Sequence, residues 1–444
     1  MSPVDLPLSA DGRRSSAAFG RAVVSDALRA ADPALADAAS ATADWRKGYI
    51  AHFRALTAHA DAVAAAGLAS VHARMDLPAF DGGGSLQAES IAGTGTPERE
   101  LILPHRGELL SGDRLRRRLD AWVAAGTIEP SCASAVLLVM DNPDWLDLSD
   151  QRLVVLGAGA EMGPLPAVLA WGGTVIGVDL PRAELWERVT ATAEKSAGRL
   201  TALRADLLEQ LPEVAGWLAQ VEGPLVLGNY VYAPGVTHLK LAIAVDALGE
   251  HLRGLRGDVA LAGLATPTDV FEVPSSAVEE SRERWRQRSR RARAGSVVTG
   301  RRMLRPNYPE GGPPLNDSMV AQQGPNYALA KRIQRWRAAV ARRDGVTVSY
   351  NVAPPTWTRS VTNNRLLAAA YAGAHLFDVE VFEPATANRL MAALLVHDLR
   401  NPRPAAESVA EDEAAGAAHG GLWRVAYQPR TCLPLAAAVG LFKR

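Results

Sequence analysis

Apolar residues recur every three or four positions along much of the first third of the chain, between residues 15 and 75, which is also rich in alanine. This spacing places apolar side chains on one face of a helix. The positions are Phe19, Val23, Val24 and Leu28 on a first face and Trp45, Ile50, Phe53 and Leu56 on a second. Two further helices are predicted at 111–125, before Gly126, and at 130–141, beginning at Pro130. The glycines and prolines of 79–107 predict loops.

From residue 152 onward short apolar runs alternate with helical patterns. The candidate strands are 152–156, 174–178, 200–204, 224–228, 258–264 and 346–352, with 376–381 as a seventh candidate. Strands that alternate with helices indicate a parallel sheet with helices on both faces. We therefore predict an α/β fold: a doubly wound, Rossmann-like parallel sheet with a helical N-terminal extension and a long insertion before the helix that begins near residue 324.

The same pattern divides the chain into three parts. A helical extension covers 1–145, the α/β domain covers 146–400, and a tail covers 401–444. Inside the α/β domain, an insertion at about 270–320 interrupts the alternation with an arginine-rich helix and a loop rich in glycine and proline. The tail is polar and acidic up to about residue 420, which predicts a surface loop there.

Composition narrows the classes of function. The 444 residues carry 48 Lys and Arg and 48 Asp and Glu, so the formal net charge is zero and gives no reason to expect a nucleic-acid or membrane partner. The two cysteines, Cys132 and Cys432, cannot form a metal-binding CxxC motif, and the histidines show no ligand spacing. No apolar run is long enough to span a membrane, and the first residues lack the apolar core of a secretory signal. We expect a cytoplasmic protein without a metal.

The first strand ends in glycines, in the segment Val154-Val-Leu-Gly-Ala-Gly-Ala-Glu-Met-Gly-Pro164. Such glycines let the backbone turn tightly and approach a pyrophosphate, and a helix that follows offers free N–H groups to the phosphates. The second strand ends at Asp179, 22 residues after Gly157, where nucleotide-binding folds place the acid that holds the ribose hydroxyls.

Asp179 also bears on the choice of cofactor. A carboxylate repels a 2′-phosphate, so Asp179 favours NAD(H). Arg182, three residues later, offers a partner for that phosphate and keeps NADP(H) open. The structural alternative for Asp179 is the N-cap of the following helix.

A second motif, Tyr327-Ala-Leu-Ala-Lys331, lies in the helix predicted after the insertion. At a spacing of four residues, Tyr327 and Lys331 share one helical face. A lysine ammonium beside a tyrosine hydroxyl favours the phenolate and lowers its pKa. Such a tyrosine exchanges a proton with a carbonyl or alcohol oxygen. Alone, this spacing is more typical of an ordinary surface helix.

Together these motifs resemble the short-chain dehydrogenase/reductase family, over about residues 152–385. In that family a T-G-x-x-x-G-x-G loop binds the cofactor and a helix carries YxxxK. Gly157 and Gly163 match the first and last glycines of the loop, whereas Glu161 replaces the middle one. In the family's strand before YxxxK a serine positions the substrate carbonyl, and here Thr266 or Thr268 offers the hydroxyl.

The resemblance also implies cofactor contacts at matching positions. Asp206, at the end of the third strand, matches an acid beside the adenine, and Asn229 lies where the family has an Asn-Asn-Ala-Gly strand end. Thr358, beyond Pro354-Pro355, is the candidate contact of the nicotinamide amide. The implied cofactor-binding residues are Gly157, Gly159, Glu161, Met162, Gly163, Asp179, Asp206, Asn229, Lys331 and Thr358.

The function that the resemblance implies is hydride transfer between NAD(P) and a carbonyl or alcohol substrate. Tyr327 would be the acid or base, Lys331 would lower its pKa and hold the ribose, and Thr266 or Thr268 would polarise the carbonyl. The chain departs from the family in two respects. Tyr327 follows Thr266 by 61 residues, more than is usual there, and the family's catalytic asparagine has no matching residue.

Two alternatives stay open at this point. An S-adenosylmethionine-dependent methyltransferase shares the opening of strand, glycine loop, helix, strand and acid. A nucleotide-binding member of the fold without redox chemistry would account for the insertion and the missing asparagine. We expect a small-molecule substrate and a homo-oligomer.

The arginines of the insertion have two interpretations. They offer a site for an anionic substrate, or they pair with Glu279, Glu280 and Glu283 on a solvated helix, which we favour. The basic positions run through Ser281-Arg-Glu-Arg-Trp-Arg-Gln-Arg-Ser-Arg-Arg-Ala-Arg293 and continue at Arg301, Arg302 and Arg305. We expect His238, His375 and His397 to be structural or solvent-facing.

Overall fold

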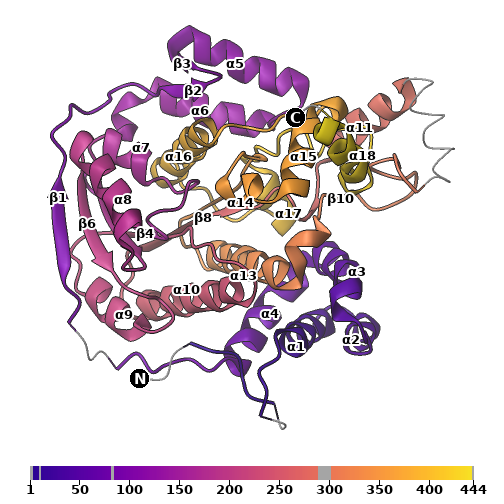
Figure 1. The fold of residues 1–444 in the computed structure, drawn as a ribbon, viewed down its shortest axis with the longest axis horizontal. Helices are drawn as coiled ribbons and strands as arrows, with labels where there is room; N and C mark the ends of the chain where they lie inside the picture. Colours follow the sequence, from indigo (N-terminus) through magenta and orange to yellow (C-terminus); the bar gives the residue numbers. More distant parts are fainter. Residues whose placement is uncertain (1–3, 10–11, 82–84, 289–301, 443–444) are drawn as a thin grey trace.

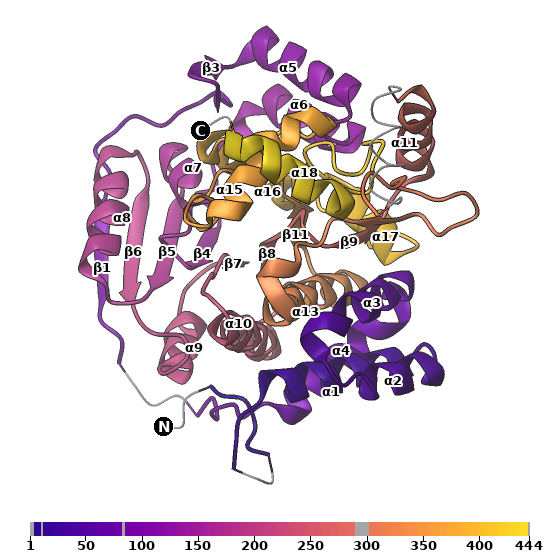
Figure 2. The same ribbon diagram turned by 45° about the vertical axis from the view of Figure 1, so that its right-hand side comes forward.

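A seven-stranded sheet forms the centre of the computed structural model, which describes residues 4–9, 12–81, 85–288 and 302–442 (Figure 1). Its strand order is β1-β6-β5-β4-β7-β8-β11, which Figure 2 shows from left to right. The strands are β1 Ala88–Ala92, β4 Arg152–Leu156, β5 Thr174–Asp179, β6 Arg199–Arg204, β7 Leu225–Asn229, β8 Val259–Ala265 and β11 Val348–Val352. Six of them run parallel, and β1 pairs antiparallel with the edge strand β6.

The six parallel strands confirm the predicted α/β fold. Each begins and ends within two residues of the predicted positions. In chain order they lie 3-2-1-4-5-6, the order of the dinucleotide-binding fold. The chain crosses from β6 back to β7 on the other side of β4. The carboxyl ends of β4 and β7 therefore form the switch point at which such folds bind ligands.

Each face of the sheet is covered by helices because the strand residues alternate between two apolar clusters. In β4, Val154 and Leu156 are buried against one face and Leu153 and Val155 against the other. Each such fully buried side chain contributes about 2 kcal/mol. One face is covered by α9 (Leu211–Ala219), α10 (Val236–Leu255) and α13 (Gly324–Arg343). The other face is covered by α6 (Pro130–Asp141), α7 (Leu165–Ala170), α8 (Ala183–Lys195) and α16 (Pro384–Arg400).

The predicted N-terminal helices form a group beside α13, at the lower right of Figure 2. They are α1 (Ser16–Arg29), α2 (Pro33–Ser40), α3 (Trp45–Ala58) and α4 (Ala60–Arg74), and Ser15, Asp32 and Asp44 cap the first three. A Cβ at Gly67 of α4 would lie 2.4 Å from the ring of Trp336 on α13. The missing side chain at Gly67 is therefore what lets the two helices meet.

The prediction of loops over 79–107 was wrong for three short segments. Residues 88–92 form β1, and β2 (Leu103–His105) pairs with β3 (Glu108–Leu110) as a hairpin before α5 (Gly112–Ala125). Only Ile91 of β1 is buried, so its hydrophobic pattern is weak. These residues form a strand because they pair with the otherwise open edge of β6, and not because they bury an apolar face.

The seventh strand predicted at 376–381 was also wrong. That region holds the 3-10 helix η3 (Ala374–Phe377), followed by Asp378 with a φ of 58°. The left-handed backbone at Asp378 ends regular structure there. A single bridge between Phe382 and Thr356 is all the pairing that the described residues make near it.

The described parts of the insertion and the tail hold regular structure beyond the arginine-rich helix that the sequence predicts. In the insertion, β9 (Val270–Glu272) pairs with β10 (Leu315–Asp317), and α11 (Ser275–Gln287) and η2 (Ala321–Gln323) flank them. In the tail, α17 (Val409–Ala414) buries Asp412 and Glu413, which pair with Arg403 and Arg335. The surface-loop prediction therefore fails beyond about residue 408. The remaining elements are η1 (Pro143–Leu146), α14 (Arg359–Thr362), α15 (Arg365–Gly373) and α18 (Pro429–Phe442).

The division into 1–145, 146–400 and 401–444 stays a prediction. Along the described parts of the chain, no helix is both long and apolar enough to cross a membrane.

Candidate active site

The glycine loop begins where β4 ends. Gly157 has a φ of 87°, and a Cβ there would lie 2.9 Å from the carbonyl oxygen of Tyr230, just after β7. Both facts require glycine, because other residues rarely adopt this backbone and the space is filled by main chain. The first glycine of the motif thus sets the close approach of β4 to β7 at the switch point.

Asp179 binds the glycine loop directly. Its Oδ2 accepts a hydrogen bond from the N–H of Gly159 at 2.9 Å, and its Oδ1 accepts one from Leu180 at 2.8 Å. Burial raises the pKa of Asp179, against the opposite effect of these hydrogen bonds and of Arg182 and Arg188. Asp179 is not the N-cap of α8, because Arg182 occupies that position.

Side chains from other elements hold the rest of the loop. Glu161 Oε2 accepts from the N–H of Arg359 at 2.7 Å, and Glu161 Oε1 lies 3.3 Å from Arg359 Nε. Asn388 on α16 donates from Nδ2 to the carbonyl oxygen of Gly163. Met162 packs against the apolar cluster on the α16 side of the sheet. The loop is therefore tied to α14 and α16.

The helix after the loop is shorter than the motif predicts. α7 has six residues, with Pro164 at its N-cap position and Pro166 in its first turn. Proline has no N–H, so fewer donors point toward a phosphate than expected. The Cβ of any side chain at Gly159 would lie 2.8 Å from Cγ of Leu185, which packs against the loop there.

The other implied cofactor residues are spread along the sheet edge. Asp206 Oδ1 accepts from the N–H of Leu208 at 2.9 Å, so this acid shapes the turn after β6. Thr358 precedes α14, and its hydroxyl lies 2.9 Å from that of Ser360. Asn229 ends β7, but its side chain lines a hollow on the α10 and α13 side of the sheet.

The four predicted catalytic residues line one pocket of about 230 Å³, part of it open to solvent. Thr266 and Thr268 follow the carboxyl end of β8, and Tyr327 and Lys331 lie one turn apart on α13. Thr266 lies near Tyr327 and lowers its pKa, although burial has the larger and opposite effect. Thr266 Oγ1 lies 2.9 Å from Thr268 Oγ1, which donates to Gln323 Oε1 at 3.0 Å. After the long insertion the chain comes back to the end of β8, so Tyr327 and Lys331 lie beside Thr266 and Thr268.

The electrostatics of the pair differ from the expectation. Burial raises the pKa of Tyr327, so the phenol keeps its proton, whereas the motif predicts a lowered pKa. Burial lowers the pKa of Lys331 to about 8, against the effect of Asp269. Lys331 Nζ donates to Gln334 Oε1 at 3.0 Å instead of to the phenol. Desolvation is the largest cause of both shifts, and neither group is among the causes of the other's shift.

His238 does not line the pocket itself but packs against Tyr327, a contact that sequence reasoning missed. Its ring stacks on that of Tyr327 at 5.3 Å and lies at a tilt of 51° to that of Tyr232 at 5.5 Å, and only 1% of it is exposed. Neither ring nitrogen has a hydrogen-bond partner among the described residues. The sequence holds no motif around His238 that would have indicated this.

Tyr49 was missed as well, because it comes from the N-terminal helix α3. It is 1% exposed and lines the same pocket, with Met319 and Val320 from the end of the insertion. Asp269 also lines the pocket, and it pairs with Arg332 at 3.2 Å and with Arg335 at 2.7 Å. Arg335 also pairs with Glu413 at 2.6 Å, so these buried ion pairs join α13 to the insertion and to the tail.

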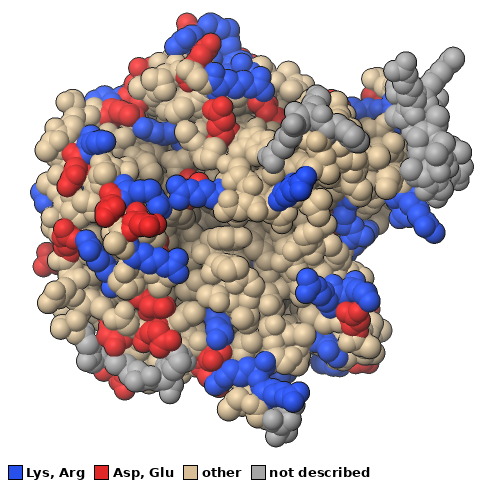
Figure 3. All heavy atoms as spheres, viewed as in Figure 1, with Lys and Arg blue, Asp and Glu red and all other residues tan. Residues whose placement is uncertain are grey.

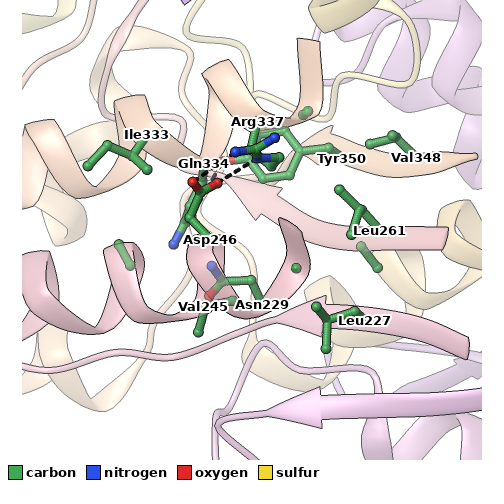
Figure 4. A pocket seen from close by; sticks show the side chains of 14 residues that line it. Leu227, Asn229, Val245, Asp246, Leu261, Ile333, Gln334, Arg337, Val348 and Tyr350 are labelled. Carbon is green, nitrogen blue, oxygen red and sulfur yellow. Dashed lines mark hydrogen bonds and ion pairs between the residues drawn. The ribbon is translucent and has the colours of Figure 1, made fainter. Parts of the chain in front are cut away.

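A second hollow of about 470 Å³ lies beneath the sheet, between α10 and α13 (Figure 4). Its wall is mostly apolar, and Arg337 pairs there with Asp246 at 2.7 Å. Asn229 Oδ1 and Gln334 Nε2, which both line it, have no partner among the described residues. Gln334 connects the two hollows, since its Oε1 accepts from Lys331.

The surface near the carboxyl ends of the strands is hollowed. Figure 3 shows a recess near the middle of the face, between α14 and α13 in the view of Figure 1, with an uncharged visible lining. Charged side chains gather around it rather than in it. This setting suits an uncharged part of a ligand more than an anionic one.

Two arginines of α11 pair with its own glutamates, whereas Arg282 donates to the carbonyl oxygen of Pro309. Arg284 lies 2.5 Å from Glu280 and Arg286 lies 2.9 Å from Glu283, as the solvated-helix interpretation predicts. Arg290, Arg291, Arg293 and Arg301 fall outside the described residues. Across the described part of the chain, no three His, Cys, Asp or Glu side chains gather as metal ligands.

Comparisons with known proteins return matches among solved structures, whereas no protein-family model and no curated protein matches the chain. The chain is similar to a short-chain dehydrogenase/reductase from Serratia marcescens, with 14% identity, 62% of this chain and 99% of that chain covered, and a TM-score of 0.37. It is also similar to the terminal R domain from the myxalamid PKS-NRPS biosynthetic pathway, with 13% identity, coverage of 56% and 61%, and a TM-score of 0.33. An A1-type ketoreductase gives 16% identity, coverage of 56% and 46%, and a TM-score of 0.33. Strand order and parallel register give the chain a Rossmann-like fold.

Proposed function

We propose that the protein is an NAD(P)-dependent oxidoreductase of the short-chain dehydrogenase/reductase type, which acts on a carbonyl or alcohol group of a small molecule. One observation carries this proposal: Tyr327, Lys331 and the hydroxyl of Thr266 line a single pocket at the carboxyl edge of the sheet, although 61 residues separate Thr266 from Tyr327. A chance YxxxK on a surface helix would not share a pocket with two threonines from the end of a central strand.

The residues present fit a dinucleotide at the switch point. Gly157 keeps the backbone close, and Asp179 lies at the end of β5, where its carboxylate would exchange the N–H of Gly159 for ribose hydroxyls. Asn229 Oδ1, at the end of β7, is a buried acceptor without a partner among the described residues, and it faces the hollow between α10 and α13. Asp179 favours NAD(H), and Arg182 and Arg188 near it keep NADP(H) open.

The bound cofactor supplies or accepts the hydride, and the chain supplies the proton and the positioning. Tyr327 keeps its proton because burial raises its pKa, so it is an acid ready to donate to a carbonyl oxygen. Thr266, held by Thr268, offers a second hydrogen bond to that oxygen. Lys331 is charged below its lowered pKa of about 8 and favours negative charge developing nearby. These protonation states favour reduction of a carbonyl near neutral pH.

The test is a titration of the purified protein with NADH, NADPH and S-adenosylmethionine, followed by fluorescence or calorimetry. Binding of NADH weakened by Asp179→Ala supports the proposal and justifies a screen of uncharged carbonyl compounds. Binding of S-adenosylmethionine without a response to either dinucleotide contradicts it.

One observation favours a second candidate, a nucleotide-binding protein of this fold without redox chemistry. The glycine loop is bound by Asp179, Glu161 and Asn388 and leads into a short, proline-containing helix. Dinucleotide binding without turnover of any carbonyl or alcohol, in both wild type and Tyr327→Phe, would support this candidate.

A further inference from the structure

His238 lies at the start of the contact between α10 and α13. It is the third residue of α10, one turn before Ala242, and Ala242 lines the hollow that faces α13. Tyr327 is the fourth residue of α13, one turn before Lys331. Residues four apart share a helical face, so His238 and Tyr327 form the first side-chain pair of this contact, at the carboxyl edge of the sheet.

The ring of His238 supports the ring of Tyr327. The two rings stack with centroids 5.3 Å apart and an angle of 22° between their planes. Tyr232, which is 59% exposed, also packs against His238, with ring centroids 5.5 Å apart. The imidazole therefore contacts both the phenol that we assign to proton transfer and a tyrosine at the surface.

The polar atoms of His238 have no structural use. Both ring nitrogens are buried without a partner among the described residues, although a neutral imidazole carries one donor and one acceptor. Leaving buried polar atoms unpaired destabilises a protein. A phenylalanine or leucine would fill this position without that cost.

A second buried histidine shows how this chain pairs a structural imidazole. His419 also stacks on an aromatic ring, that of Trp423, at 4.6 Å. Its Nε2 lies 2.9 Å from Glu129 Oε1, and its Nδ1 accepts from the N–H of Gly421 at 3.2 Å. The two histidines are equally buried, and only His238 leaves both nitrogens open.

The surroundings of His238 select an uncharged partner. Burial lowers the pKa of His238 to about 3, and the nearby charge of Lys331 adds to this effect. The imidazole is therefore neutral at physiological pH and offers one N–H and one lone pair. A hydroxyl or a carboxamide group matches both, whereas a carboxylate has no donor to give.

We propose that His238 belongs to the site in two ways: it positions the ring of Tyr327 by stacking, and it hydrogen-bonds an uncharged hydroxyl or carboxamide of the molecule that binds beside Tyr327. This rests on the proposed function for the identity of that molecule. The group belongs either to the nicotinamide cofactor or to the substrate.

The test compares His238→Phe, which keeps the stacked ring and removes both nitrogens, with His238→Ala, which removes both features. His238→Gln restores a donor and an acceptor without the ring. His251→Phe is the matched control. The ring of His251 also stacks on an aromatic ring, that of Phe80, with centroids 4.2 Å apart, and His251 does not line the pocket. Each variant is measured by thermal melting, by titration with NADH and NADPH, and by kcat and KM on carbonyl compounds that the wild type reduces.

We expect His238→Phe to melt about 1–3 °C above the wild type, because no unpaired nitrogen remains in the free protein. We expect its Kd for the dinucleotide, or its KM for the carbonyl compound, to rise about 10-fold. A change in Kd assigns the hydroxyl or carboxamide to the cofactor, and a change in KM alone assigns it to the substrate. His238→Gln should recover part of this loss, and His238→Ala should also lower kcat.

Two results overturn the inference. One is a melting temperature of His238→Phe as low as that of His238→Ala, which would mean that the nitrogens are paired within the protein. The other is His238→Phe with Kd, KM and kcat all within twofold of the wild type. If the wild type binds no dinucleotide and reduces no carbonyl, the proposed function fails. The melting comparison then still decides whether the nitrogens of His238 are kept free for a ligand.

Discussion

The glycine loop and the pocket around Tyr327 lie at the same edge of the sheet, yet they differ in whether their buried polar groups have hydrogen-bond partners. At the loop, Asp179, Glu161 and Asn388 all bind main-chain groups of the protein. Around Tyr327, both nitrogens of His238 and Nε2 of Gln334 are buried without a partner among the described residues. Lys331 is an ammonium group in surroundings that disfavour its charge.

The difference separates groups that stabilise the fold from groups kept for a ligand. A satisfied hydrogen bond contributes about 1 kcal/mol to folding, whereas an unpaired buried polar group costs about 1–3 kcal/mol. Substitutions at the loop should therefore destabilise the free protein, and substitutions at the pocket should remove activity while leaving stability unchanged or higher.

The largest expected effect is on turnover by Tyr327→Phe. Removing the hydroxyl removes the proton donor, and general acid catalysis contributes about 100- to 10,000-fold. We expect kcat for carbonyl reduction to fall within this range, with the dinucleotide Kd within twofold of wild type. Tyr427→Phe, distant from the pocket, is the control and should keep its kcat. Retention of more than about a tenth of the activity by Tyr327→Phe would remove this residue from the mechanism.

The next effect is a gain of stability that depends on pH. The pKa of Lys331 falls from its usual 10.5 to about 8 in the folded protein. Below pH 8 the lysine is charged in both folded and unfolded states, so the folded state carries the whole penalty, about 3 kcal/mol. Between about pH 8 and 10.5 the folded protein loses this proton first and the penalty disappears. Stability of the wild type should therefore rise with pH over this range.

Lys331→Met tests this penalty by denaturant unfolding at several pH values. Its free energy of unfolding should exceed that of the wild type by up to about 3 kcal/mol near pH 7, and the gap should shrink to about 1 kcal/mol near pH 9.5. Lys195→Met, at an exposed lysine, should show no such gap. A gap that is constant with pH would mean that packing, rather than the charge of Lys331, sets the difference. Reductase activity should fall as pH rises through about 8.

The two regions also differ in how far the sequence predicts them. Local patterns predict the six parallel strands, because each is an apolar run beside a turn, and YxxxK pairs Tyr327 with Lys331 through helical spacing alone. The motifs also place Thr266 at the end of a strand. Parallel strands end at one edge of the sheet, and Tyr327 lies at this same edge, so the two residues come together although the insertion separates them in sequence.

Contacts between distant segments leave no such pattern. His238 is one of two histidines on an alanine- and leucine-rich helix, and only its contact with Tyr327 distinguishes it from the other. Tyr49 enters the pocket from the N-terminal helices, which carry no chemical motif. The sequence places Asp179 at the correct strand end, but the hydrogen bond from Gly159 depends on how closely β4 and β5 pair. The pKa of Tyr327 depends on burial, which YxxxK does not encode.

A smaller effect of opposite sign is expected at the loop. Asp179→Ala removes the acceptors for the N–H groups of Gly159 and Leu180, so the free energy of unfolding should fall by about 1–2 kcal/mol. The dinucleotide Kd should rise as well, because the ribose loses its acid. Asp179→Asn keeps one acceptor and should lie between the two proteins in stability. If Asp179→Ala is as stable as the wild type, the hydrogen bonds of Asp179 do not stabilise the fold. The loop and the pocket then do not differ in the way proposed.

The smallest effect concerns the contact between Glu161 and Arg359, where the main-chain and side-chain parts can be separated. The Arg359 side chain is 63% exposed, and its ion pair with Glu161 spans 3.3 Å. Exposed pairs contribute between zero and about 1 kcal/mol, so Arg359→Gln should change the free energy of unfolding by less than about 0.5 kcal/mol, and added salt should remove the change. Glu161→Ala also removes the acceptor for the N–H of Arg359 and should cost about 1 kcal/mol at any salt concentration. Equal, salt-sensitive losses in both variants would show that the charge, rather than the main-chain hydrogen bond, holds the loop to α14.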